Sequence, residues 1–337
     1  QGSCPLEAMP RDEVTMVYPG GQTRCMFSTE PDYAFQVVPG DSDKLLVHFQ
    51  AGGACWDDLS TNMVKPRPCS TSLEVQPLSG VFDRARSANP FRRYTVVHVQ
   101  YCSGDLHAGD VARWYLDPAG VPVEQRGYRN AASAVAWARA NLGARLESLV
   151  LSGCSVGAVG AQLWASEVLS QFEYKAAAVI ADSYAGVLPA QAQGELLERL
   201  GACGSGLLRG GLAAACEERR LSIPDVFDSA MRAFPGVAFA SINSKYDEQQ
   251  MAFYQAVAQQ GLSFGGLSKA SFYAKLNTIL ERYNRNANFV SYLVAGDGST
   301  YLLRPLLYTA DTSGPGGGQD QVPGARAALA GWLAELP

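Results

Sequence analysis

The segment from Ser148 to Gly160 contains the pattern Gly-x-Ser-x-Gly, with Ser155 at its centre. In this pattern a short strand turns tightly into a helix, and the turn lifts the serine hydroxyl clear of the sheet edge at the helix N-terminus. The residues around the serine must then be small, as Gly153, Gly157 and Ala158 are. We therefore expect Ser155 to be a catalytic nucleophile, the alternative being a purely structural strand-turn-helix.

A glycine-rich turn, Ala51–Ala54, follows an apolar strand expected at Lys44–Gln50. Small residues let backbone N–H groups point freely at the oxyanion of an acyl-transfer intermediate. Gly52 and Gly53, together with the N–H of Val156 directly after the nucleophile, would complete an oxyanion hole of two or three donors. An ordinary strand-to-loop turn has the same composition, so this assignment depends on the neighbouring elbow.

In enzymes whose nucleophile lies on such a strand-turn-helix, the catalytic triad follows the chain order serine, then an aspartate or glutamate, then a histidine. Asp182 and Asp247 each end an expected strand after Ser155. We favour Asp247 because it follows the later strand, from which an acid normally reaches the histidine. Either aspartate could instead cap a helix or accept loop N–H bonds.

The chain has only three histidines, and all of them precede Ser155. His48 and His98 lie inside apolar strands and are expected to be core residues. His107 lies on a strand-end loop that faces the proposed site, so it is the one histidine that could assist catalysis.

These residues lie at the ends of strands that alternate with helices, which predicts an α/β fold with a mostly parallel sheet covered on both faces. Its ligand would bind beyond the carboxyl ends of the strands. The expected strands are 44–50, 94–101, 148–152, 176–181, 237–243 and 289–294, and a helix is expected over 127–142. We expect a single domain over 1–337, with an N-terminal cap or hairpin (1–40), helical insertions that could form a lid (188–235 and 248–288), and a loop (313–324) before a closing helix (325–336).

The composition excludes several classes of function. A net charge of −5 with interspersed signs leaves no basic stripe for nucleic acid. The chain has no apolar run approaching the ~18 residues that span a bilayer, and it opens without the charged and apolar regions of a signal peptide, so we expect a mature protein. No metal site, phosphate loop or nucleotide fingerprint is present, and we expect no cofactor.

Eight cysteines without a Cys-x-x-Cys pair favour disulfides in an oxidising compartment, and hence a secreted or periplasmic protein. Proximity along the chain favours the pairs Cys4–Cys25, Cys55–Cys69 and Cys203–Cys216. The remaining two, Cys102 and Cys154, could pair if both loops curl together, and a buried free thiol is an equally good interpretation.

Five motifs occur together in order along the chain. They are His48–Trp56, Val99–Asp110, Arg126–Asn130, Ser152–Gly157 and Asp247–Gln250. Together they resemble the pectin acetylesterase and Notum family of serine carboxylesterases, and the bacterial-type members more than the plant or animal ones. The resemblance implies a secreted α/β-hydrolase that removes an acyl group, expected to be acetyl, from a polysaccharide or, in Notum, from a lipidated protein. It also implies Ser155 as nucleophile, Asp247 as acid, and Gly52, Gly53 and Val156 as backbone donors. We expect a monomer.

The family's catalytic histidine should follow the last strand, in a segment shaped like Ala-Gly-x-x-His-Thr. Here that segment is Ala295–Thr300, and Ser299 stands where the histidine should be. A serine hydroxyl of ordinary pKa cannot take the proton of Ser155 at neutral pH, so the general-base step is lost. Three explanations remain open: a deliberately inactivated variant, a natural pseudoenzyme that binds an ester or glycan, or a scaffold turned to a different reaction.

Two hypotheses from different classes follow. A polymer esterase with an impaired triad predicts that Ser299→His creates or restores ester hydrolysis. A binding protein on an esterase scaffold predicts saturable binding without turnover and no gain from the histidine. A lesser alternative is lipase-like action on long acyl chains, which needs an apolar tunnel.

Overall fold

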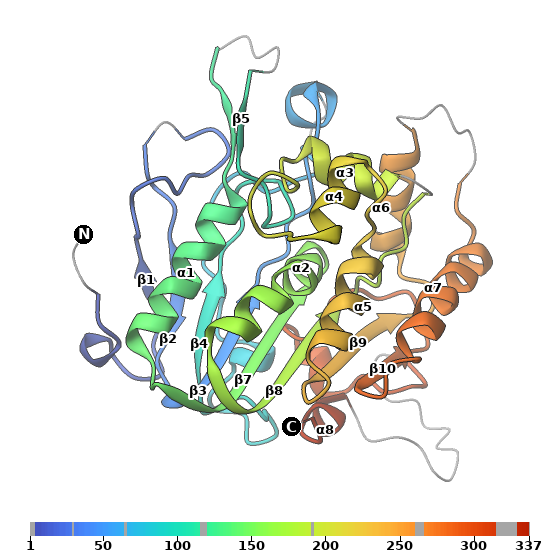
Figure 1. The fold of residues 1–337 in the computed structure, drawn as a ribbon. Helices are drawn as coiled ribbons and strands as arrows, with labels where there is room; N and C mark the ends of the chain where they lie inside the picture. The colour runs from blue at the N-terminus through green and yellow to red at the C-terminus, as the bar shows by residue number, and fades with distance from the viewer. Residues whose placement is uncertain are drawn as a thin grey trace.

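The computed structural model describes residues 4–28, 30–63, 66–114, 120–189, 192–259, 266–314 and 329–336. Eight of the described strands form one twisted sheet in the order β1-β2-β4-β3-β7-β8-β9-β10 (Figure 1). Their bounds are β1 Thr15–Val17, β2 Phe35–Val38, β3 Asp41–Phe49, β4 Tyr94–Val99, β7 Arg145–Cys154, β8 Glu173–Asp182, β9 Ala238–Ser244 and β10 Phe289–Val294. The six strands β4, β3, β7, β8, β9 and β10 are neighbours in this spatial order, and each pairs in parallel with the next. This confirms the predicted α/β sheet.

The central strands are buried on both faces, which is why they appear in the sequence as nearly continuous apolar runs. Leu45, Val47 and Phe49 of β3 point into one core, and Leu46 points into a second core on the opposite face. All four side chains are fully buried. The register pairs Leu46 with Val150 of β7, so each strand adds to both cores.

Helices cover the first face of the sheet. α1 (Gly127–Asn141) and α2 (Val156–Gln171) lie across it, and α5 (Ile223–Ala233) packs against α2 (Figure 1). On the opposite face, the second core contains side chains of the short helices η3 (Gly80–Phe82), η4 (Pro305–Tyr308) and α8 (Leu329–Leu333). The closing helix predicted at 325–336 is therefore present from 329 to 333, while 315–328 lies outside the described residues.

The predicted N-terminal cap or hairpin is a hairpin that extends the main sheet. β1 pairs antiparallel with β2, and β2 pairs antiparallel with β4. A second hairpin, β5 (Val111–Arg113) with β6 (Val123–Gln125), projects beyond the sheet (Figure 1).

Both segments predicted as helical insertions contain helices. The first holds α3 (Ala192–Arg199), α4 (Gly211–Glu217) and α5, and the second holds α6 (Glu248–Gln259) and α7 (Lys269–Tyr283). α3, α4 and α6 lie beyond the carboxyl ends of β7, β8 and β9 (Figure 1).

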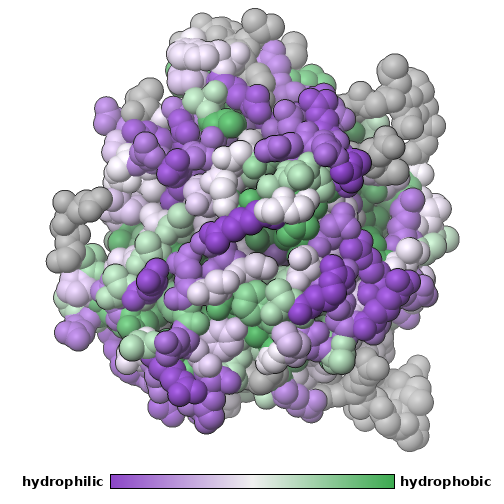
Figure 2. All heavy atoms as spheres, in the orientation of Figure 1, coloured by the Kyte–Doolittle hydropathy of each residue, from purple (hydrophilic) through white to green (hydrophobic). Residues whose placement is uncertain are grey.

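Figure 2 shows hydrophilic side chains over much of the face that carries α1, α2 and α5, interrupted by small hydrophobic areas. The single-domain organisation stays a prediction.

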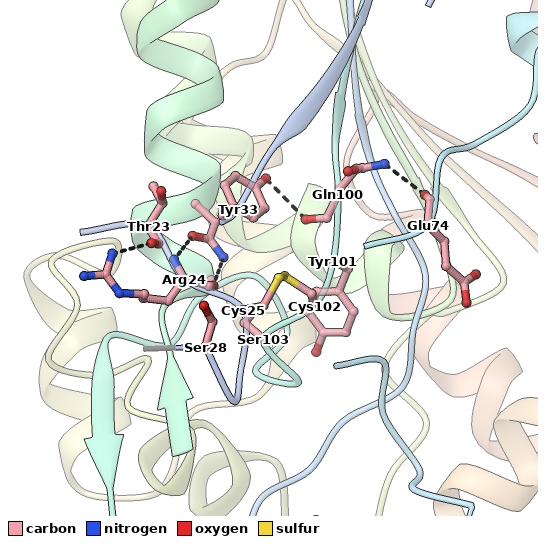
Figure 3. Close-up of a disulfide and its surroundings, with 12 residues drawn as sticks. Thr23, Arg24, Cys25, Ser28, Tyr33, Glu74, Gln100, Tyr101, Cys102 and Ser103 are labelled. Atoms are coloured by element: carbon pink, nitrogen blue, oxygen red, sulfur yellow. Dashed lines mark hydrogen bonds between the residues drawn. A yellow bond between two sulfur atoms is a disulfide. The ribbon is translucent and has the colours of Figure 1, made fainter. Parts of the chain in front are cut away.

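Three disulfides link Cys25 to Cys102, Cys55 to Cys69 and Cys203 to Cys216. Two of the three predicted pairs are thus confirmed, and Cys4–Cys25 is wrong. Cys25 lies against the segment after β4 and bonds to Cys102 there (Figure 3). The Met26 N–H donates to the Cys102 carbonyl at 2.8 Å. Cys4 lies instead against α1, and its carbonyl accepts from Trp137 Nε1 at 2.9 Å. Cys4 and Cys154 are free thiols.

Candidate active site

The turn between β7 and α2 has the strained geometry of a nucleophile elbow. Ser155 has φ 54° and ψ −120°, in a region that non-glycine residues rarely adopt. Its N–H donates to the Asp182 carbonyl at 2.8 Å, which ties the turn to β8. A Cβ on Gly153 would lie 2.0 Å from the Gly157 oxygen, and one on Gly157 would lie 1.9 Å from the Phe49 oxygen. The two glycines are therefore required by close backbone approach.

The glycine turn after β3 lies beside the elbow. Gly53 has φ 68°, and a Cβ there would lie 1.8 Å from the Pro68 oxygen. The Ser70 N–H donates to the Gly52 carbonyl at 2.7 Å, and together with the Cys55–Cys69 disulfide it holds the turn. No hydrogen bond between described residues uses the N–H of Gly53 or Val156. Both donors thus remain free for a ligand.

A pocket of about 350 Å³ opens over Ser155, Gly53 and Val156. The second insertion supplies one wall, since α6 contributes Gln249, Gln250, Ala252, Phe253 and Ala256. Tyr184, two residues after Asp182, also lines the pocket, together with Pro68. The cavity is mainly apolar around the Ser155 hydroxyl, which suits the acyl or alcohol part of an ester.

Asp247 lies at the start of α6 and is fully buried. Its two carboxylate oxygens accept from Gln250, one from the backbone N–H at 2.9 Å and the other from Nε2 at 3.0 Å. Burial raises the pKa of Asp247 to about 6, and the hydrogen bonds from Gln250 oppose that rise. Gln250 lines the pocket with Ser155, so it connects the carboxyl group to the cavity.

Ser299 lies in the loop after β10, where it is 5% exposed. Its hydroxyl faces the Asp247 carboxyl closely enough to lower the pKa of that group. However, Ser299 Oγ makes no hydrogen bond of normal geometry with any described residue. The structure therefore brings positions 247 and 299 together.

Asp182 is buried beside the same loop and does not line the pocket. One of its oxygens accepts from the N–H groups of Tyr301 at 2.6 Å and Leu302 at 2.8 Å, and the other accepts from Ser183 Oγ at 2.8 Å. Burial raises the pKa of its carboxyl group. Asp182 thus anchors the segment that directly follows Ser299.

The histidines lie away from the pocket lining. His107 Nε2 donates to the Gln50 carbonyl at 2.8 Å, and its buried ring packs on Phe49 and Tyr101. Burial lowers the pKa of His107 to about 4. His48 and His98 stack on each other with ring centroids 5.4 Å apart, and both pack against Phe82 of the second core. Their burial agrees with the prediction that they are core residues.

Several residues that line the pocket received no role from the sequence, among them Gln250, Tyr184 and Phe253. The signal for Gln250 was its spacing, because a residue three positions after a helix-capping aspartate can bond back to it. No local pattern marks Tyr184 or Phe253, which reach the pocket only through the packing of α6 against the elbow region.

A sequence model described as pectinacetylesterase matches residues 13–195. The chain belongs to this family. It is thus an ester hydrolase by class. Among solved structures, two crystal forms of the Wnt deacylase Notum from Drosophila superpose on it. One covers 96% of this chain and 93% of its own at a TM-score of 0.63, the other 86% and 85% at 0.60, each with 14% identity. At this identity the likeness shows the α/β-hydrolase fold. No curated protein sequence matches significantly.

None of the described helices is both long and apolar enough to cross a bilayer. Among the described residues, no three His, Cys, Asp or Glu side chains are grouped so that they could hold a metal ion.

Proposed function

We propose that this family member is a secreted serine carboxylesterase-type protein whose pocket binds an acylated polysaccharide or a related polymer. The observation that carries the proposal is Ser155, held at φ 54° beside a pocket that also contains the free N–H groups of Gly53 and Val156. The three disulfides support secretion, because such bonds persist in oxidising compartments.

In this proposal Ser155 Oγ attacks the ester carbonyl, and the backbone donors at Gly52, Gly53 and Val156 stabilise the oxyanion. Asp247 would orient the base, and Ser299 occupies the position of that base. The phenol of Tyr184 cannot substitute, since burial raises its pKa. Loss of a positioned base costs about 10²–10⁴ in rate, so turnover by this chain should be strongly impaired.

The size of the pocket is compatible with more than one length of acyl group. Its volume of about 350 Å³ exceeds what an acetyl group fills, and Phe253 and Val156 make it apolar. The remaining space would take the alcohol part of a polymer ester or, in the second candidate function, a longer acyl chain. Rates on acetate, butyrate and octanoate esters distinguish the two, because a long-chain deacylase gains with chain length.

The decisive experiment measures hydrolysis of p-nitrophenyl acetate by the chain and by Ser299→His, each with and without Ser155→Ala. A gain of several orders of magnitude that Ser155→Ala removes would support the triad assignment. If the histidine changes nothing while acetylated pectin binds saturably, the protein is a binding protein on an esterase scaffold.

A further inference from the structure

A second cavity, here called the outer cavity, lies in the first insertion. It has a volume of about 600 Å³, and its walls come from the start of α3, the turn that ends α4 and the residues that lead into α5. It shares no lining residue with the pocket over Ser155. Its volume lies within the range of cavities that bind small ligands.

Close contacts hold the walls of the outer cavity in place. Arg219 adopts φ 58°, and its carbonyl oxygen lies against Gly194 of α3, where a Cβ would be 2.2 Å from that oxygen. Gln193 bonds to both neighbouring segments. Its Nε2 donates to the Gly186 carbonyl at 2.9 Å, and its Oε1 accepts from the Ile223 N–H at 2.8 Å. The outer cavity is therefore part of a fixed framework.

The charged side chains that line the outer cavity balance one another. Two are acidic and two are basic, namely Glu195, Glu218, Arg219 and Arg220. Each has an opposite charge beside it. Arg220 Nε donates to Glu218 at 2.8 Å. Arg219 Nη2 lies 3.4 Å from Glu198, and the Glu195 carboxylate accepts from Arg199 at 2.7 Å. An anion would meet two carboxylates here and a cation two guanidinium groups, so the charges favour a neutral ligand.

The same charged groups can still form hydrogen bonds with a ligand. A guanidinium carries five N–H donors and a carboxylate about four acceptor sites, so the ion pairs leave most of this capacity unused. A hydroxyl is the neutral group that donates and accepts with one atom. Leu188, Pro189 and Leu221 add apolar wall to the same cavity. A sugar ring fits both parts, because hydroxyls surround its edge and C–H groups cover its faces.

The outer cavity is a neighbour of the pocket over Ser155. A small internal cavity of about 10 Å³ shares Tyr184 and Phe253 with that pocket, and it shares Leu188 and Gln193 with the outer cavity. The side chains around this small cavity therefore separate the two larger ones. A polymer held at one of them has an effective concentration at the other on the order of mM, when the connecting segment is short and flexible.

We propose that the outer cavity binds neutral sugar units of the polymer whose ester group enters the pocket over Ser155. The inference rests on the proposed function for the role of the polymer as substrate, whereas the binding of the sugar needs no turnover. The outer cavity then contributes to affinity for the polymer and takes no part in the chemistry.

Titration calorimetry on the full unmodified chain tests this binding directly. The probes are cellopentaose, xylopentaose, mannopentaose and galactopentaose, with pentagalacturonate as an anionic comparison of equal length. We expect at least one neutral probe to bind more tightly than pentagalacturonate. Its Kd should change less than about twofold between roughly 0.05 and 0.5 M NaCl, because salt screens interactions between charges. Binding of pentagalacturonate alone, or of no probe at all, would overturn the proposal.

Substitutions in the outer cavity test the location. Arg219→Gly removes a guanidinium and suits the backbone, since glycine adopts φ 58° without strain. Glu195→Ala removes an acceptor at an exposed position of α3. Each should weaken binding of the neutral probe about tenfold, because hydrogen bonds to charged groups are among the stronger ones. Arg209→Ala is the matched control, because its side chain is 73% exposed in the same insertion and does not line the cavity.

The circular dichroism spectrum of each variant should match that of the unmodified chain. If Arg219→Gly and Glu195→Ala bind the neutral probe as tightly as Arg209→Ala does, the sugar occupies another place and the assignment is refuted. In the Ser299→His background, Arg219→Gly should raise KM for acetylated xylan about tenfold with little change in kcat, whereas Arg209→Ala should change neither.

The two proposals can fail separately. If neutral sugars bind the outer cavity while Ser299→His hydrolyses no ester, the sugar site stands and the esterase function fails. If Ser299→His hydrolyses p-nitrophenyl acetate while no neutral pentasaccharide binds, the esterase function stands and the present inference fails.

Discussion

Asp182→Ala should destabilise the protein by about 2–5 kcal/mol, because it leaves two buried backbone donors without an acceptor. These donors are the N–H groups of Tyr301 and Leu302, which lie 2.6 and 2.8 Å from one Asp182 oxygen. Each unsatisfied donor costs about 1–3 kcal/mol. Part of this cost is offset because the variant no longer buries a carboxyl group, whose burial is unfavourable and raises its pKa. The Ser183 hydroxyl also loses its acceptor.

Asp182→Asn provides the matched comparison. Asparagine keeps one side-chain oxygen in the same place, so the two backbone donors retain their acceptor and the cost should stay below about 1.5 kcal/mol. Asp297→Ala is the control within the same loop, since that side chain is 58% exposed and should change stability by no more than ~0.5 kcal/mol. Urea unfolding followed by circular dichroism measures all three.

The pH dependence gives a second measure. Burial raises the pKa of Asp182 above its ordinary 3.8, so folding disfavours the charged form. As the pH rises from about 4 toward neutrality, the wild-type chain should therefore lose stability relative to Asp182→Asn. In the Ser299→His background, Asp182→Ala should lower kcat more than it changes KM, because the displaced loop misplaces the base. If Asp182→Ala, Asp182→Asn and Asp297→Ala unfold at the same urea concentration, Asp182 does not hold this loop.

Three further predictions follow from other parts of the fold. Gly157→Ala should lower the free energy of unfolding by more than about 3 kcal/mol, because its Cβ would lie 1.9 Å from the Phe49 oxygen. A Cβ on Gly211 meets nothing within 4 Å, so Gly211→Ala should be neutral or stabilising by up to ~1 kcal/mol. Thermal unfolding measures both variants. Burial lowers the pKa of His107 to about 4, so folding is not penalised by this group above pH 6.5 and loses stability as the pH falls toward 4. His107→Asn should therefore reduce the acid-induced loss of stability by about 3 kcal/mol in urea titrations at a series of pH values. An unchanged slope of stability against pH would contradict this. Replacing both Cys25 and Cys102 by alanine should cost about 2–5 kcal/mol, while Cys4→Ala should change little, and peptide mapping without reductant should recover Cys25 linked to Cys102 and to no other cysteine.

The sheet could be predicted from the sequence because parallel strands buried on both faces leave an unmistakable apolar pattern. The strands at 44–50, 94–101, 176–181, 237–243 and 289–294 are all present with small shifts of their ends. By contrast, β2 has four residues, and its place in the main sheet depends on pairing with β4, 60 residues later. The Cys25–Cys102 bond spans 77 residues for the same reason. Local patterns cannot specify contacts at such separations.

The candidate site divides in the same way. The elbow and the glycine turn are local features, so Ser155, Gly53 and Val156 could be proposed from short motifs. The choice between Asp182 and Asp247 could not be made from local sequence, since both end a strand. The donors that engage Asp182 lie 119 and 120 residues away, and the pocket wall that connects Asp247 to Ser155 is a helix of the second insertion.

The site contains three features that each cost stability. Ser155 adopts a strained backbone conformation, Asp247 is a buried carboxyl group, and the buried Ser299 Oγ, which faces that carboxyl, makes no hydrogen bond of normal geometry among the described residues. A purely structural turn would explain the first feature alone. One arrangement relates all three, namely a base between Ser155 and Asp247 that accepts from one and donates to the other. In the proposed function the strained serine and the two free backbone donors serve an ester, and Ser299→His with Ser155→Ala as its control separates that function from binding without turnover.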